Sequence, residues 1–199
     1  MEFAAGDNVR MSFEYERLLK FESHPEPSGP ATMLIAMSGW MDGGEVSTGT
    51  VSGIVDELNA EPLATIDSDP FYIFNFPGSM EINAMFRPHI TVEAGRLESI
   101  GLPHNTFYFD EKRNLVLFVG HEPNLRWPSF AEAFFQMVAI MDVQRVFFVG
   151  SYAGAVPHTR EPRLFCAASN DALREELKKY DVREVDYEGP GSFTTYLLS

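Results

Sequence analysis

Three short segments of the chain are apolar almost without interruption, and a glycine follows each of them within two residues. They are residues 32–37 (TMLIAM), 115–119 (LVLFV) and 145–149 (RVFFV). Apolar runs of this length without polar alternation are typical of strands that are buried on both faces, as in parallel sheets. The pattern therefore predicts three buried strands in a mostly parallel sheet.

A stripe of apolar side chains predicts a helix over residues 129–142. Ser129 and Glu132 have the spacing of a capping box, which predicts that the helix starts there. The stripe consists of Phe130, Phe134, Met137, Val138 and Met141. A second helix is predicted over residues 45–58, where Gly49 and Gly53 indicate close packing against a neighbour.

A third helix is predicted after Asn170, which can cap it, with Glu175 and Lys179 paired on its outer face. Residues 67–105 contain four prolines, and we expect this irregular stretch to wrap the edge of the sheet. Residues 106–110 and 115–119 flank a polar turn, which predicts two antiparallel strands. Alternating strands and helices predict an α/β fold.

The length of 199 residues favours one domain. We assign residues 1–30 to an N-terminal extension, of which residues 24–30 form an extended lead-in rich in proline. Residues 31–199 then form a single α/β domain.

The composition excludes several classes of function. Fifteen basic against 29 acidic residues give a formal charge of −14, which disfavours binding to nucleic acid or to an anionic membrane. Cys166 is the only cysteine, so no internal disulfide can form, and no zinc-ligand spacing is present. The first thirty residues contain no long apolar run. These features predict a soluble, cytoplasmic protein without a metal or cofactor.

Unusual loops follow the three predicted strands, at residues 39–44 (GWMDGG), 120–127 (GHEPNLRW) and 150–160. Because the carboxyl ends of parallel strands share one edge of a sheet, we expect these loops to be neighbours. A functional interpretation is an anion-binding or acid–base cluster, and the alternative is a structural network of ion pairs and hydrogen bonds. The candidate residues are Trp40, Asp42, Asp67, Glu122, Trp127, His158 and Arg160.

No complete catalytic motif accompanies this cluster. The loop at residues 39–44 lacks the lysine and the spacing of a phosphate-binding P-loop. Ser151 follows Gly150 directly, so the G-x-S-x-G turn of a nucleophile elbow is absent. Trp40 and Trp127 could stack on a ligand, but tryptophans in loops more often cover the edge of a core.

Four motifs in order resemble the proteasome-assembly-chaperone family, specifically the prokaryotic relatives of proteasome assembly chaperone 2. They are GWMDGG at 39–44, GHEP at 120–123 followed by Trp127, VPHTR at 156–160 and EGPG at 188–191. The resemblance covers roughly residues 31–199. It implies a three-layer α/β/α, nucleoside-phosphorylase-like fold and homo-oligomers. For eukaryotic and archaeal relatives it implies help in the assembly of proteasome α-subunits.

The chain departs from this family pattern near its end. Relatives that dock on proteasome rings carry a tyrosine next to the last residue, whereas Tyr196 lies three residues before Ser199. Family members also continue past the Gly-Pro motif into a further helix and strands. We therefore expect an incomplete sheet unless a further segment or a partner completes it.

Three functions are compatible with these observations. The first, which the resemblance and the lack of a catalytic motif favour, is a non-catalytic assembly or interaction protein with protein partners. The second is an enzyme or sensor for a small anionic, nucleoside-like ligand, in which Arg160 would hold the anion and His158 or Glu122 would move a proton. The third is a structural homo-oligomer, suggested by the two helix glycines and by the helix around Phe134 and Met137.

Overall fold

The computed structural model of the protein describes residues 18–25, 27–154, 156–161 and 163–199. The chain divides into two compact units, the first ending at Ser151 and the second running from Tyr152 to Ser199. The first unit contains the central sheet, and each unit is described here by itself.

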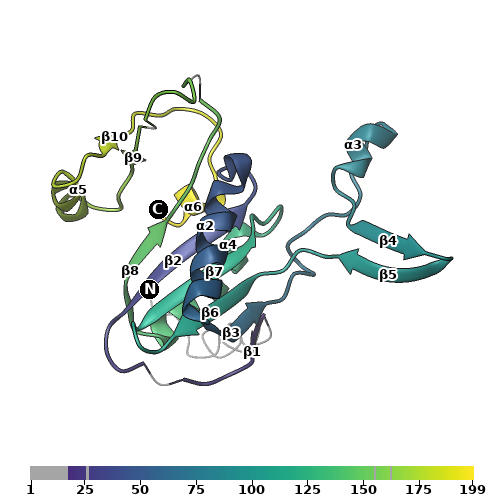
Figure 1. The fold of residues 1–199 in the computed structure, drawn as a ribbon, viewed down its shortest axis with the longest axis horizontal. Helices are drawn as coiled ribbons and strands as arrows, with labels where there is room; N and C mark the ends of the chain where they lie inside the picture. The colour runs from purple at the N-terminus through teal and green to yellow at the C-terminus, as the bar shows by residue number, and fades with distance from the viewer. Residues whose placement is uncertain (1–17, 26, 155, 162) are drawn as a thin grey trace, which may run out of the picture. The chain divides into compact units, whose positions relative to one another are not determined.

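Six strands form the central sheet in the order β1-β3-β6-β7-β2-β8 (Figure 1). Neighbouring strands pair in parallel from β7 through β2 to β8, and antiparallel from β1 through β3 and β6 to β7. The strands are β1 (Leu19–Phe21), β2 (Ala31–Ser38), β3 (Glu61–Ile66), β6 (Thr106–Asp110), β7 (Leu115–His121) and β8 (Val143–Phe148).

The predicted α/β fold and the predicted antiparallel pair β6–β7 are confirmed. The sheet itself is mixed, with two parallel and three antiparallel pairings, whereas a mostly parallel sheet was predicted. The pairings make β2, β3, β7 and β8 run in one direction and β1 and β6 in the other, because β6 enters by a hairpin instead of a helical crossover. Strand β1 lies within the predicted extension, so the sheet begins before Ala31.

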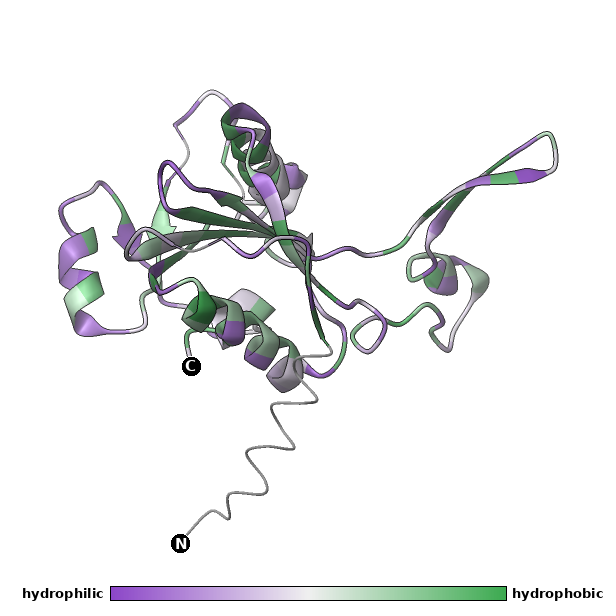
Figure 2. Ribbon diagram, turned by 90° about the horizontal axis from the view of Figure 1, so that it is seen from below, coloured by the Kyte–Doolittle hydropathy of each residue, from purple (hydrophilic) through white to green (hydrophobic). Residues whose placement is uncertain are grey.

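Two helices cover the two faces of the sheet, which gives three layers (Figure 2). Helix α2 (Val46–Leu58) buries Val51 against Ala36 and Leu117 on one face. Helix α4 (Trp127–Ile140) lies on the other face, where the ring of Phe134 is 5.6 Å from that of Phe107. The predicted apolar stripe of α4 is therefore the core of this face.

Both helices begin differently from the predictions. Helix α4 starts at Trp127, with Pro128 in its first turn, and its N-cap Arg126 makes no side-chain capping bond. The predicted capping box is wrong because proline, which favours the start of a helix, moves that start two residues upstream. A short 3₁₀ turn, η1 (Gly43–Glu45), precedes α2. In the described chain, a Cβ on Gly49 or Gly53 would meet nothing within 4 Å, so the predicted close packing is absent there.

Strand β8 departs from the expected burial. The side chains of Val146 and Phe147 are 44% and 47% exposed, whereas the prediction placed this run inside the sheet. In the described sheet β8 is an edge strand that pairs with β2 alone. A short apolar run does not reveal whether a strand is central or at the edge.

Residues 80–101 form an arm instead of wrapping the sheet edge as predicted. It contains helix α3 (Met80–Ala84) and a hairpin of β4 (His89–Glu93) and β5 (Arg96–Gly101). The hairpin is a two-stranded sheet of its own and lies apart from the central sheet in both views (Figures 1 and 2).

The second unit contains a parallel pair, β9 (Phe165–Cys166) with β10 (Arg183–Glu184), and helices α5 (Asp171–Leu177) and α6 (Phe193–Tyr196). Asn170 caps α5, as predicted, because its Oδ1 accepts a hydrogen bond from Leu173 N at 2.9 Å. The partner of Glu175 is Lys178 at 2.6 Å instead of the predicted Lys179.

Candidate functional site

The loops after β2, β7 and β8 meet at one edge of the sheet, which we call the strand-end rim. The backbone N–H of Trp40 donates to Glu122 Oε2 at 2.9 Å, which joins the first loop to the second. The backbone N–H of Ser151 donates to the carbonyl of Met41 at 2.8 Å, which joins the first loop to the third. The prediction that these loops are neighbours is confirmed as far as Ser151.

Close contact between the first two loops requires a glycine at position 39. Gly39 has φ +137°, and a Cβ there would lie 2.7 Å from Glu122 Oε2 and 2.8 Å from Glu122 Cβ. An L-residue would be strained in this conformation and would push the carboxylate away. Gly39 therefore allows Glu122 to reach the backbone N–H of Trp40.

The carboxylate of Asp42 is occupied by the start of helix α2. Its Oδ1 accepts from the backbone N–H groups of Ser47 at 2.8 Å and Thr48 at 3.1 Å, and its Oδ2 accepts from the Thr48 hydroxyl at 2.7 Å. The fully buried Ser47 hydroxyl in turn donates to the carbonyl of Val149 at 2.5 Å. Asp42 thus caps the helix and supports the junction of β2 and β8, which favours a structural interpretation of this residue.

A buried polar network holds the backbone at the end of β7, next to the rim. Asn105 is 1% exposed, and its Oδ1 accepts from the backbone N–H of His121 at 3.0 Å. The Tyr72 hydroxyl lies 2.6 Å from the carbonyl oxygen of His121 and 2.9 Å from Asn105 Oδ1. A Cβ on Gly120 would come within 2.6 Å of Asn105 Oδ1, so the network needs glycine there.

Burial changes the acid–base properties of two members of this network. Desolvation raises the pKa of the Tyr72 phenol well above its ordinary value, against the opposing effect of its hydrogen bond with Asn105. Desolvation also lowers the pKa of the His121 imidazole below its ordinary value of 6.5. At neutral pH the rim therefore presents a protonated phenol and an uncharged imidazole.

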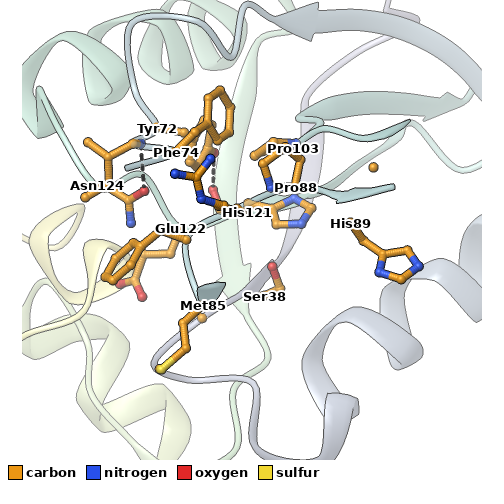
Figure 3. Close-up of a pocket in the computed structure, with 15 residues that line it drawn as sticks. Ser38, Tyr72, Phe74, Met85, Pro88, His89, Pro103, His121, Glu122 and Asn124 are labelled. Atoms are coloured by element: carbon orange, nitrogen blue, oxygen red, sulfur yellow. Dashed lines mark hydrogen bonds between the residues drawn. The ribbon is translucent and has the colours of Figure 1, made fainter. Parts of the chain in front are cut away.

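A cavity of about 350 Å³ opens between the rim and the base of the arm (Figure 3). Ser38, His121 and Glu122 line it from the rim, and Arg87 and His89 line it from the arm. Figure 3 shows His121 and Glu122 beside Tyr72 on the wall of this cavity. The charged and polar lining could contact a small polar ligand, or the side chains of a bound protein segment.

A model of the PAC2 family matches residues 36–199. The chain belongs to the PAC2 family. A search of curated proteins found no match.

Solved structures of similar proteins come from bacteria and archaea. A PAC2 family protein from Streptomyces avermitilis has a TM-score of 0.67 at 25% identity, over 84% of this chain and 68% of its own. A Mycobacterium tuberculosis proteasome-assembly chaperone homologue has a TM-score of 0.69 at 24% identity, over 83% of this chain and 67% of its own. The chain thus spans about two thirds of the length of these two proteins.

An archaeal protein has the same fold at lower identity. PbaB of Pyrococcus furiosus, described as a proteasome activator, has a TM-score of 0.58 at 17% identity, over 90% of this chain and 72% of its own. The predicted family and fold class are confirmed by these matches. At this level of identity the archaeal structure speaks for the fold alone.

The structure brings three of the residues predicted for the candidate site, Trp40, Asp42 and Glu122, to the strand-end rim. Trp40 is exposed, so its side chain does not cover the core there. Trp127 is half-buried at the start of α4, and its Nε1 donates to the carbonyl of Pro123 at 2.7 Å, which holds the second loop. Asp67, at the end of β3, forms an ion pair with Lys20 at 3.2 Å.

His158 and Arg160 are exposed in a turn of the second unit, where Arg160 N donates to the carbonyl of Pro157 at 3.0 Å. Their convergence with Asp42 and Glu122 stays a prediction. The sequence reasoning missed Tyr72, Asn105 and Arg87. Tyr72 and Arg87 lie in the stretch assigned to the sheet edge, and Asn105 ends that stretch, so no strand-end pattern marked them.

The described residues contain neither a metal-ligand cluster nor a helix suited to a membrane. No three histidine, cysteine or carboxylate side chains gather in that part of the chain in a way that could hold a metal ion. None of the helices described is both long enough and apolar enough to cross a membrane.

Proposed function

We propose that this PAC2 family protein is a non-catalytic assembly or interaction protein that binds a protein partner. The observation that carries the proposal is the contrast between the rim and the sheet edge. At the rim, Asp42 and Asn105 are committed to hydrogen bonds that hold loops and a helix start together. At the edge, β8 exposes large apolar side chains.

Strand β8 offers two features that a protein segment can bind. In the described sheet no strand pairs with its outer side, so its backbone can accept a further strand. Val146 pairs with Met33 and Phe147 with Leu34, which places the two exposed side chains on opposite faces of the sheet. An added extended segment could therefore gain both backbone hydrogen bonds and apolar contacts.

The names of the similar proteins suggest the class of partner. One is described as a proteasome-assembly chaperone homologue and another as an archaeal proteasome activator. We therefore take proteasome subunits, or proteins that resemble them, as the partner class. The formal charge of −14 favours a partner that presents a neutral or basic surface.

The test is native mass spectrometry of the purified chain mixed with proteasome α-subunits from the same organism. The unmodified chain should form a stoichiometric complex, and a Phe147→Lys variant should bind at least ~10-fold more weakly, because a charge would replace a buried apolar contact. Gln144→Lys is the matched control on the same exposed strand and should bind normally. Absence of a complex, or equal loss in both variants, would reject the proposal.

A second function is favoured by one observation, the cavity at the rim. Its volume of about 350 Å³ is near the lower limit for small-molecule sites, and Arg87 supplies a cation to its lining. An enzyme or sensor for a small anionic, nucleoside-like ligand would use this cavity. Titration calorimetry with a nucleoside monophosphate tests this second function. If the unmodified chain binds the nucleotide, Arg87→Ala abolishes the binding and Arg96→Ala leaves it intact, the result supports the second function over the first.

A further inference from the structure

The hairpin of the arm is amphipathic. Its register pairs Ile90 with Ile100 and Val92 with Leu97. Ile90 and Val92 are two apart on β4 and so share a face, and each shares that face with its cross-strand partner. A register shift between Thr91 and Val92 lets Leu97 and Ile100, which are three apart on β5, join the same face. The opposite face carries polar and charged pairs, namely Thr91 with Ser99 and Glu93 with Arg96.

The aliphatic face is uncovered in the structure. Ile90, Val92, Leu97 and Ile100 are 53%, 55%, 61% and 49% exposed. Helix α3 does not cover them, and its own Met80 and the nearby Met85 are more than four-fifths exposed. A two-stranded hairpin is marginally stable in water unless its apolar face packs against something.

We propose that this aliphatic face is a self-association surface that packs against the same face of a second copy of the chain. Two such hairpins, stacked face to face about 10 Å apart, would form a small four-stranded sandwich. The interface would be isologous, since each copy contributes the same side chains about a two-fold axis. The proposal is independent of partner binding at β8, because the two surfaces share no residue.

The distribution of charge favours a second copy of the chain as the partner of this aliphatic face. The segment 76–102 contains three acidic and two basic residues, so it carries −1 of the formal charge of −14. Two copies of a strongly acidic chain repel each other over most of their surface. The arm is nearly neutral, so the repulsion between copies is weakest there.

Exposed apolar side chains around the aliphatic face enlarge the apolar surface of this part of the chain. Nine large apolar side chains of residues 76–102, the arm and its flanking residues, are exposed, and at roughly 60–120 Å² for each fully exposed side chain they present roughly 300–600 Å², of which the four of the aliphatic face contribute roughly 130–260 Å². A standard interface covers about 800 Å² on each partner, of which about 60% is apolar. These nine are Phe76, Met80, Ile82, Met85, Ile90, Val92, Leu97, Ile100 and Leu102.

This surface differs from the one on which the sequence-based expectation of a homo-oligomer rested. That expectation invoked the helix around Phe134 and Met137, but both side chains are completely buried in the core beneath α4. They cannot contact another copy without unfolding the first unit. The arm supplies the exposed apolar surface that this helix lacks.

Sedimentation velocity over a range of concentrations tests the proposal with the full chain. The unmodified chain should dimerise, and Leu97→Lys or Leu97→Glu alone should raise the Kd about 100-fold. An equimolar mixture of the two variants should recover part of the lost affinity, because an isologous interface brings opposite charges together. Ser99→Lys, on the polar face of the same strand, should dimerise like the unmodified chain.

A cysteine pair keeps the test decisive if a charged variant disturbs the hairpin. In a Cys166→Ser background, Val92→Cys on the aliphatic face should form a disulfide dimer under mild oxidation, and Thr91→Cys on the polar face should not. A chain that stays monomeric at all concentrations would overturn the proposal. Equal weakening by Ser99→Lys and Leu97→Lys, or equal cross-linking at both cysteine positions, would also overturn it.

Discussion

Replacing Asp42 separates a structural role from a chemical one at the strand-end rim. In Asp42→Ala the backbone N–H groups of Ser47 and Thr48 lose their acceptor, and the Thr48 hydroxyl loses its partner. In Asp42→Asn the side-chain Oδ1 is retained for both backbone groups. The Thr48 hydroxyl can then accept from the new amide, so most of the cap should survive.

The expected loss of stability in Asp42→Ala follows from the capping geometry. Loss of a side-chain cap costs about 1 kcal/mol in most helices and up to about 2 kcal/mol at favourable sites. Here one charged carboxylate serves two backbone groups beside the buried Ser47, so we expect a loss of about 2 kcal/mol for Asp42→Ala. For a chain of this size that loss lowers the Tm by roughly 4–8 °C.

Thermal unfolding followed by far-UV circular dichroism measures this loss. We expect Asp42→Asn to unfold within ~0.5 kcal/mol of the unmodified chain and Asp42→Ala well below it. Equal stability of Asp42→Ala and the unmodified chain would refute the capping argument. So would equal destabilisation in the two variants, because the carboxylate charge would then matter more than the acceptor.

Three further outcomes test the surroundings of the rim. Asn105→Leu leaves the part-buried backbone N–H of His121 without its acceptor and should lower the free energy of unfolding by about 2 kcal/mol in a urea titration. An unchanged midpoint would contradict the role of buried Asn105 in this network. The pKa of His121 in the folded chain is depressed, so its contribution to stability is complete above pH 6.5 and is lost as the pH falls toward the folded pKa. His121→Gln should therefore make the free energy of unfolding less dependent on pH below 6.5. The same pH dependence in both chains would contradict the depressed pKa. Gly39→Ala should lower the free energy of unfolding by about 2 kcal/mol, because position 39 has a positive φ and a Cβ there would lie too close to Glu122. A variant as stable as the unmodified chain would show that the loop rearranges freely.

The sequence predicted the elements whose information is local. The apolar run of β2, the β6–β7 hairpin, the stripe of α4 and the cap Asn170 each depend on side chains a few residues apart. The family follows from motifs that are short and ordered along the chain, and it is confirmed over residues 36–199. Periodicity and turn chemistry carry this information because helices and hairpins are made by near neighbours.

What the sequence could not decide depends on contacts between distant parts of the chain. The apolar run of β8 looks like that of β2, yet β8 is an edge strand with Val146 and Phe147 exposed, because strand order is set by long-range pairing. Asp42 looked like a site residue, and only the fold shows its carboxylate capping α2. By itself the sequence determined the fold class, the family and most elements. Tertiary structure decided which strand lies at the sheet edge, which face of the arm is exposed and which partners the buried polar groups have, because burial depends on which distant segments meet.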